Sequence, residues 1–431
     1  MLNHIKPSTA LSAALLFAGT FAQAQEPASI EELQKQIEEL RANQEALIDD
    51  TSDAQIGFST VDTAFSHNGM GAAASKVYAT KSPLSIGGYG DMYYAKPDSG
   101  DGVSDVYHFV PYIGYKFSDN IILNTEIEFE HGGANPEKEE PEGYAIVEFM
   151  YLDFLIDQAF NVQLGQLLVP MGLINLRHEP TLYNTVQKPS AETLVIPSTW
   201  SASGVLAYGT VGDTGLSYNA GLIQALDLDH EATGTPEFMH EVSGSAGGKS
   251  TFNKAAFVGR LDYRGIDALL LGGSLYYGDA TQGSVSGAAA LLYDLHLTYE
   301  KHGFKLKALY TALAVFNAEN LAQANEANKE ATKDANGYYL NLEYDLLSSF
   351  ATTHRLPVFA QYNYVNPGAT VVDRFGATTA NNVGEAVTTT VGVNYFPHEQ
   401  VVLKIDYAMT DMKAAGERDY DTFSLGLGFI F

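Results

Sequence analysis

The histidine and carboxylate side chains with the clearest potential for catalysis or metal binding gather in one segment of the sequence. The group consists of Asp227, Asp229, His230, Glu231, His240 and Glu241. The segment is rich in Gly, Ser and Thr, which is typical of a solvated loop, and oxygen-rich loops take up hard cations without a dedicated geometry. The chain has no cysteine, no nucleophile elbow and no glycine-rich phosphate loop. We therefore expect no enzymatic activity, no cofactor and no metal centre.

A second set of charged residues recurs at alternate positions within apolar runs. The acids of this set are Glu126, Glu128, Glu130, Glu148, Asp262, Asp294, Glu300, Glu343, Asp345 and Asp406, and the bases are Arg260, Arg264, Lys305, Lys307 and Lys404. Alternate residues of a strand share one face, and a water-filled lumen accepts such a charged face where a soluble core does not. Because the acids outnumber the bases, the pattern favours weak or cation-leaning selectivity, or an anion site confined to one patch.

The opposite face of these runs is apolar, and the end of the chain shows this most clearly. Phe423, Leu425, Leu427, Phe429 and Phe431 alternate with Ser424, Gly426 and Gly428. A strand this apolar would aggregate at a soluble sheet edge, whereas a closed barrel in lipid pairs both of its edges. The terminal Phe431 also resembles the signal that the outer-membrane assembly machinery reads.

The gaps between the runs alternate in length from residue 83 to residue 431. Short gaps begin at Ser118, Asp157, Gly212, Gly265, Lys301, Leu347 and Pro397, and longer gaps separate the other runs. Alternating turns and loops are typical of an antiparallel barrel with both ends of the chain on the periplasmic side. The sequence therefore predicts an all-β fold, a transmembrane antiparallel β-barrel of about 16 strands.

The first part of the chain differs in character from the barrel. Residues 1–24 contain Lys6, an apolar stretch and Ala22-Gln23-Ala24, which indicate a signal peptide. Residues 25–51 place Ile30, Leu33, Ile37 and Leu40 at heptad spacing, which predicts a short coiled-coil helix. The alternative is a single amphipathic helix at the barrel mouth. We interpret residues 52–82 as a linker, without a defined role.

The most distinctive sequence motif begins in the fifth predicted strand. Gly165, Gln166, Pro170 and Gly172 precede a long loop, and a strand with Gly204 and Gly209 follows it. This pattern resembles the phosphate-selective porin (porin O and P) family of Gram-negative outer-membrane barrels, over residues 84–210. The resemblance implies a trimeric porin with a segment folded into the pore and with basic residues that select phosphate.

The loop over residues 169–202 is predicted to constrict the channel. It contains four prolines, which stiffen the backbone, and more apolar residues than a solvated loop tip accepts. The alternative is an external loop packed at a trimer interface. If the loop folds inward, its charged residues line the narrowest part of the pore or stand near it: Arg177, His178, Glu179, Lys188 and Glu192.

The sequence therefore favours an outer-membrane porin, a water-filled channel for passive diffusion of small hydrophilic solutes or ions, with anion or phosphate preference as a finer hypothesis. Two alternatives stay open, a substrate-specific uptake barrel of the siderophore type and a structural or adhesive protein tethered by its coiled coil. The expected location is the outer membrane of a Gram-negative bacterium, with the N-terminal helix in the periplasm. Expected partners are solutes, outer-membrane lipid, the assembly machinery and a homotrimer. The net charge of −28 argues against nucleic acid.

Overall fold

The strands of the described residues form one closed antiparallel β-barrel. The computed structural model describes residues 60–133, 143–229, 238–239, 249–324 and 329–431. Within these ranges it has one sheet of seventeen strands: β1 (Leu84–Pro97), β2 (Val103–Ser118), β3 (Ile121–Glu130), β4 (Ala145–Leu155), β5 (Asn161–Leu168), β6 (Ser201–Thr210), β7 (Leu216–Gln224), β8 (Ala255–Ile266), β9 (Leu269–Asp279), β10 (Ala289–Lys301), β11 (Phe304–Phe316), β12 (Glu330–Asp345), β13 (Pro357–Asp373), β14 (Thr378–Ala380), β15 (Ala386–His398), β16 (Val401–Met412) and β17 (Tyr420–Ile430).

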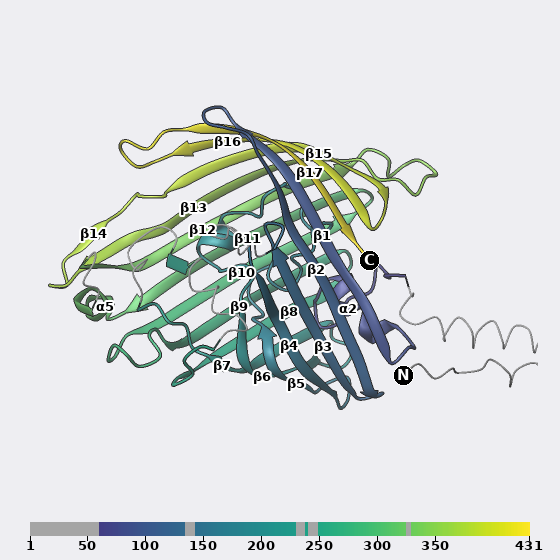
Figure 1. Ribbon diagram of the computed structural model, residues 1–431, viewed down its shortest axis with the longest axis horizontal. Coiled ribbons are helices and arrows are strands. Elements are labelled where there is room, and N and C mark those ends of the chain that lie inside the picture. Colours follow the sequence, from purple (N-terminus) through teal and green to yellow (C-terminus); the bar gives the residue numbers. More distant parts are fainter. Residues whose placement is uncertain (1–59, 134–142, 230–237, 240–248, 325–328) are drawn as a thin grey trace, which may run out of the picture. The chain divides into compact units, whose positions relative to one another are not determined.

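Pairing between the first and last strands closes the sheet. Apart from β14, which pairs with β13 while β13 also pairs with β15, each strand pairs with its neighbours in sequence. Strand β1 pairs with β17 in a register that joins Tyr89 to Ile430 and Pro97 to Thr422. Gly88 and Phe431 exchange two backbone hydrogen bonds of 2.9 Å. In Figure 1 the first and last strands lie side by side near the C-terminus. The prediction of a barrel of about 16 strands is confirmed, because β14 is a three-residue hairpin strand on β13 and the other strands form the ring.

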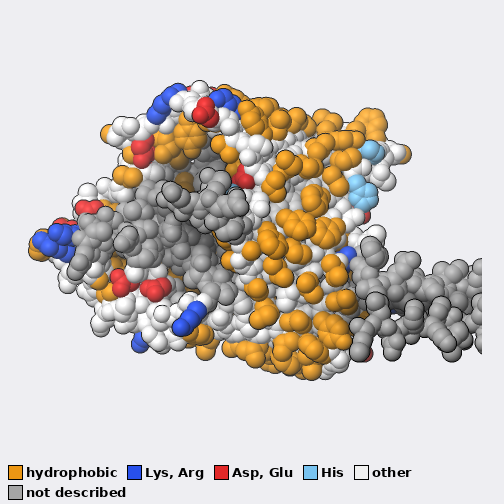
Figure 2. All heavy atoms as spheres, viewed as in Figure 1, with side chains coloured by type: hydrophobic (Ala, Val, Ile, Leu, Met, Phe, Trp, Pro, Cys, Tyr) orange, Lys and Arg blue, Asp and Glu red, His pale blue; other side chains and the backbone are white. Residues whose placement is uncertain are grey.

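Residue type alternates across the barrel wall as the sequence predicted. On β12, Tyr338, Leu340 and Leu342 are exposed on the outer face, whereas Asn341 and Glu343 are buried inside. Figure 2 shows hydrophobic side chains gathered over the outer face of the strands near β1, with charged side chains around the opposite rim. The outer surface is therefore suited to hydrocarbon and the inner surface to polar groups.

The connections alternate between short turns and long loops, which confirms the predicted topology. The structure differs where β12 begins at Glu330 and β13 extends to Asp373, because the segments assigned to loops there pair with each other. None of the helices in the described ranges has the length and apolar character needed to cross a membrane.

The described part of the predicted linker is folded against the inner face of the barrel. Helix α2 (Ala72–Ala79) contacts β1, β2 and β3. Lys76 Nζ donates to the Ile86 carbonyl at 2.8 Å, and Asn124 Nδ2 donates to the Ala74 carbonyl at 2.9 Å. Asn124 is a buried, inward-facing residue of β3. A helix within residues 52–82 was not anticipated from the sequence.

Residues 169–200, called the inner loop below, connect β5 to β6 and include the short helix α3 (Ala191–Leu194). The inner loop packs with α2 against the inner face of the wall. The buried core of the molecule therefore lies inside the barrel and includes Tyr89, Phe149, Met171, Ile196 and Trp200. Helix α5 (Ala318–Ala324) lies in the loop after β11.

The predicted signal peptide (1–24) and coiled-coil helix (25–51) lie outside the described residues. Both stay predictions from the sequence.

The apolar outer face can be tested at Leu295, which lies at the middle of β10 and is 63% exposed. We expect Leu295→Arg to lower the free energy of unfolding from lipid bilayers by about 2–4 kcal/mol, because it places a charge in hydrocarbon. The control is Val383→Arg, an exposed residue of the loop before β15, and it should change stability little. Equal effects of the two substitutions in urea titrations would contradict a lipid-facing position for Leu295.

Candidate functional site

The inner loop begins and ends at a clasp formed by Asn175. Asn175 Nδ2 donates to the carbonyls of Val169 and Trp200 at 2.6 and 2.9 Å, and its Oδ1 accepts from the Trp200 amide at 2.6 Å. The Val169 amide donates to the Trp200 carbonyl at 3.0 Å. One buried amide side chain thus holds together the two points at which the loop leaves the wall. Beside the clasp, Gln166 Nε2 donates a hydrogen bond to the Ser201 hydroxyl, and Gln166 Oε1 accepts one from the Ser203 hydroxyl. Gly165 pairs with Gly204 in the β5–β6 ladder.

Charged residues of the wall anchor the loop backbone across the barrel. Asp294 accepts from the Gly172 amide at 2.9 Å, and Asp406 accepts from the Val186 amide at 2.6 Å. Lys404 Nζ donates to the carbonyls of Tyr183 and Thr185 at 2.8 and 3.0 Å. These contacts lie on β10 and β16, so the loop reaches far from its origin at β5. The side chains of Asp294, Lys404 and Asp406 are buried at the inner face of the wall, where they bind the loop.

Asparagine residues complete these contacts. Asn184 Nδ2 lies 2.8 Å from Asn341 Oδ1 and 2.8 Å from Glu343 Oε2 on β12. Asn394 on β15 donates to the Asn184 carbonyl at 3.0 Å. The sequence analysis did not single out these asparagines or Asn175, because an isolated asparagine carries no pattern that distinguishes an anchor from a surface residue.

Glu192 is buried and pins the two ends of the loop to each other. Its Oε2 accepts from the amides of Leu173 and Ile174 at 2.8 and 2.7 Å, and its Oε1 accepts from the Tyr339 hydroxyl at 2.7 Å. Burial raises the pKa of Glu192 to about 7. The sequence analysis placed this carboxyl along the pore or near it. In the structure the side chain is fully buried and does not line the pore.

Glu179 has an equally structural position. Its Oε1 accepts from the amides of Ala73 and Ala74 at 2.9 and 3.1 Å, at the N-terminus of α2. A carboxylate there satisfies amides that have no partner within the helix. Burial raises the pKa of Glu179, although these hydrogen bonds oppose the shift. Its predicted position along the pore is likewise corrected.

Two neighbouring loop residues face opposite sides of the lumen. His178 is buried against β3, where its Nε2 lies 3.2 Å from Glu126 Oε1. Burial lowers the pKa of His178. The inner wall here is acidic, with Glu126, Glu128 and Glu148 all buried, and Glu130 partly exposed. Lys188 is half-buried and lies close enough to act electrostatically on these acids.

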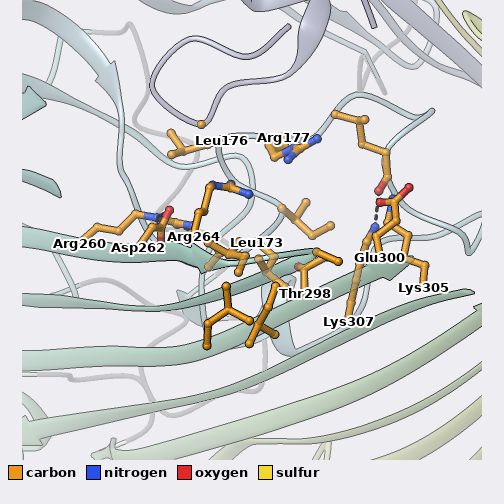
Figure 3. Close-up of a pocket in the computed structure, with 18 of the residues that line it drawn as sticks. Leu173, Leu176, Arg177, Arg260, Asp262, Arg264, Thr298, Glu300, Lys305 and Lys307 are labelled. Atoms are coloured by element: carbon orange, nitrogen blue, oxygen red, sulfur yellow. Dashed lines mark hydrogen bonds and ion pairs between the residues drawn. The ribbon is translucent and has the colours of Figure 1, made fainter. Parts of the chain in front are cut away.

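Arg177 instead borders a basic cavity of about 650 Å³ on the other side. We call this the basic pocket, and its cations are Arg177, Arg260, Arg264, Lys305 and Lys307. Figure 3 shows Arg177 of the loop and Arg264 of β8 beside the same space, with Glu300, Lys305 and Lys307 opposite. The turn between β8 and β9 also lines the pocket, which places it at the short-turn end of the barrel.

Ion pairing leaves part of the positive charge in the pocket available. Arg260 pairs with Asp262 at 3.0 Å, and Lys305 pairs with Glu300 at 2.7 Å. Among the described residues, neither Arg177 nor Arg264 has a carboxylate within ion-pair distance. Burial and the nearby Arg264 lower the pKa of Arg177. Two guanidinium groups side by side without carboxylate partners are suited to an anion.

The remaining predicted residues are dispersed. Asp229 accepts from the Ser284 hydroxyl at 2.6 Å, whereas His230, Glu231, His240 and Glu241 lie outside the described residues. The inward Asp345 accepts from the amides of Leu347 and Leu356 and holds the turn after β12.

Gly172 provides a test of the anchored loop. It has a φ of +68°, and a Cβ added there would lie 2.2 Å from Glu192 Oε2. We expect Gly172→Ala to lower the free energy of unfolding by about 1–3 kcal/mol and to displace Glu192. The matched control is Gly212→Ala, with a φ of +50° and no atom within 4 Å of the added Cβ. A penalty for Gly172→Ala no larger than the control's would contradict close packing of the loop.

Glu192 makes the loop sensitive to pH. Its pKa is raised from 4.5 to about 7, so its protonated form favours the folded state and this contribution is lost as pH rises from about 4.5 through 7. We expect wild type to lose on the order of 3 kcal/mol relative to Glu192→Gln over this window. Unfolding titrations of both proteins at pH 4.5 and 8 measure the difference. Parallel pH profiles would show that Glu192 does not titrate in this range.

Comparison with known proteins agrees with the barrel fold. An uncharacterized protein of Aquifex aeolicus (strain VF5) is 31% identical over 374 residues, which cover 84% of this chain and 83% of the relative. Residues 228–431 match the family model described as "Putative beta-barrel porin-2, OmpL-like", which differs from the phosphate-selective family that the sequence resembles.

Solved structures show the same fold at low identity, and each comparison covers 81% of this chain. A loop-deletion mutant of the outer-membrane protein OmpT of Vibrio cholerae has a TM-score of 0.52, at 10% identity over 99% of that chain. OmpF of Salmonella typhi in complex with daunomycin has a TM-score of 0.51, at 13% identity over 97% of its chain. The outer-membrane channel DcaP of Acinetobacter baumannii has a TM-score of 0.51, at 11% identity over 97% of its chain. The chain therefore belongs to the same family as the Aquifex aeolicus relative, and the solved outer-membrane barrels share its fold.

Proposed function

We propose that the protein is a diffusion channel for small hydrophilic solutes and ions, narrowed by the inner loop, with a preference for anions at the basic pocket. The observation that carries the proposal is the position of Arg177. It places a loop guanidinium that has no ion-pair partner among the described residues beside Arg264, in a cavity of about 650 Å³ at the short-turn end of the barrel.

The distribution of charge supports a directional field inside the barrel. The buried acids near His178 lie on β3 and β4, whereas the bases of the pocket lie on β8 and β11. The inner loop separates the two groups, with His178 on one side and Arg177 on the other. Bases gathered on one side of the loop retain anions there.

Phosphate selectivity is the finer form of this proposal. A phosphate accepts paired hydrogen bonds from guanidinium groups, and Arg177 and Arg264 offer such donors. The acids Asp262 and Glu300 line the same cavity, so its field is mixed. We propose general anion preference and treat phosphate as one probe of it.

Oligomeric state and orientation complete the proposal. The resemblance to trimeric porins implies a homotrimer, and the sequence predicts an N-terminal helix in the periplasm and a Phe431 that the assembly machinery reads. A substrate-specific uptake barrel and a structural protein tethered by its coiled coil are the competing functions. Large ohmic steps in planar bilayers would favour the porin, saturation by a micromolar solute would favour specific uptake, and absence of conductance would contradict both channels.

Reversal potential in a salt gradient tests the role of the basic pocket. We expect the double variant Arg177→Gln with Arg264→Gln to lower the anion-to-cation permeability ratio by about twofold or more, because it removes the unpaired charges. The control is Arg418→Gln, which removes an exposed arginine paired with Asp98 and should leave the ratio unchanged. Phosphate added to chloride solutions should reduce chloride current in wild type more than in the double variant. An unchanged ratio in the double variant would contradict the proposal.

A further inference from the structure

Three buried side chains from three separate elements converge where the inner loop meets β3 and β4. Glu126 comes from β3, Glu148 from β4 and His178 from the loop, and they are 0%, 1% and 3% exposed. One oxygen or nitrogen of each lies within 4.8 Å of the others. Two carboxylates and an imidazole at this separation form a donor set that fits a divalent metal ion.

A β-bulge aims Glu148 into this group. In the β3–β4 register Glu126 pairs with Phe149 and Ile127 pairs with Val147, so Glu148 is the extra residue between them. Both Glu148 and Phe149 are buried as a result. Regular alternation would turn one of these neighbours outward, and bulges commonly re-aim a side chain toward a site.

The hydrogen bonds of His178 determine which of its nitrogens faces the carboxylates. Nδ1 lies 2.9 Å from the Asn175 carbonyl, which only accepts, so Nδ1 carries the hydrogen. In the neutral imidazole, Nε2 then presents a lone pair to Glu126 Oε1 at 3.2 Å. Two acceptors at this distance need a cation or a proton between them. A carbonyl that fixes the distal nitrogen is also the usual support of a metal-binding histidine.

One carboxylate oxygen of each acid around His178 lacks a donor, although the Glu148 carboxyl also has a hydrogen bond with the Thr199 side chain. Glu126 Oε2 and Glu148 Oε2 are enclosed and accept no hydrogen bond from the described residues, and the same holds for Glu128 Oε1 nearby. Lys188 is the cation whose charge acts on all three acids. Buried carboxylates without donors are costly unless they are protonated, paired or bound to a metal.

We propose that Glu126, Glu148 and His178 bind one divalent transition-metal ion, such as zinc, which fastens the inner loop to the barrel wall. Because His178 belongs to the loop and both glutamates belong to the wall, the metal cross-links the two. Three protein ligands leave a position for water. The site lies across the loop from the basic pocket, so it is independent of the proposed anion preference.

A neighbouring cluster of His108, Glu128 and Glu130 has similar spacing but a different chemistry. His108 Nδ1 lies 2.7 Å from Asp91, and its Nε2 lies 3.3 Å from Glu130. With a carboxylate at each nitrogen, a protonated His108 satisfies both partners as an ion pair. This histidine therefore serves as the matched control for His178.

Zinc titration of tag-free protein, treated with a chelator and folded in detergent, tests the site. We expect isothermal titration calorimetry to show one zinc ion per chain, and both Glu148→Gln and His178→Gln to weaken binding at least about tenfold. His108→Gln, and a variant with His230 and His240 both changed to Gln, should bind zinc as wild type does. Loss of binding in either control with retention in His178→Gln would overturn the assignment, as would absence of a stoichiometric site in wild type.

X-ray absorption on zinc-loaded wild type covers the case in which the variants fail to fold. The expected first shell contains nitrogen and oxygen at about 2.0–2.1 Å with the signature of one imidazole. A shell of water oxygens alone, or of several imidazoles, would overturn the proposal. Zinc should also raise the thermal stability of wild type and not that of His178→Gln.

Discussion

Hydrogen bonds between the inner loop's backbone and charged side chains on the wall are the interactions on which the organisation of the lumen depends. Asp294, Asp406 and Lys404 point inward because strand alternation leaves them no other direction. Once enclosed, such groups need partners, since a buried charge without a hydrogen bond is costly. The loop supplies amides at Gly172 and Val186 and carbonyls at Tyr183 and Thr185. Wall and loop therefore satisfy each other's buried polar groups.

This mutual satisfaction also divides the lumen by charge. Adjacent residues of the loop, Arg177 and His178, face a basic cavity and an acidic wall. A loop held by many separate contacts cannot rotate to exchange these environments, so the two sides stay distinct. The channel chemistry proposed for one side and the metal site proposed for the other arise from this single placement. Burial of Glu192 adds a pH-sensitive contact to the same scaffold.

The candidate site was only partly predictable from residue type. The alternation rule assigns Glu126, Arg260 and Lys305 to the inner face, because the side a residue faces depends only on its position within a strand. It could not distinguish the charges that border open space from those covered by the loop. Glu179 and Glu192 were therefore predicted to stand along the pore, whereas they bind backbone amides. The anchors Asn175 and Asn184 gave no signal, since their partners are distant in sequence.

The sequence alone determined the barrel, its approximate strand number and the inward or outward direction of most side chains. These properties follow from a local period of two residues and from the spacing of turns. Tertiary structure decided how the interior is filled: α2 in the predicted linker, the path of the inner loop, the Glu148 bulge and the meeting of Arg177 with Arg264. Each of these joins residues far apart in the chain through burial and hydrogen bonding. Contacts of this kind leave no periodic trace in the sequence, because they depend on which backbone groups the closed barrel encloses.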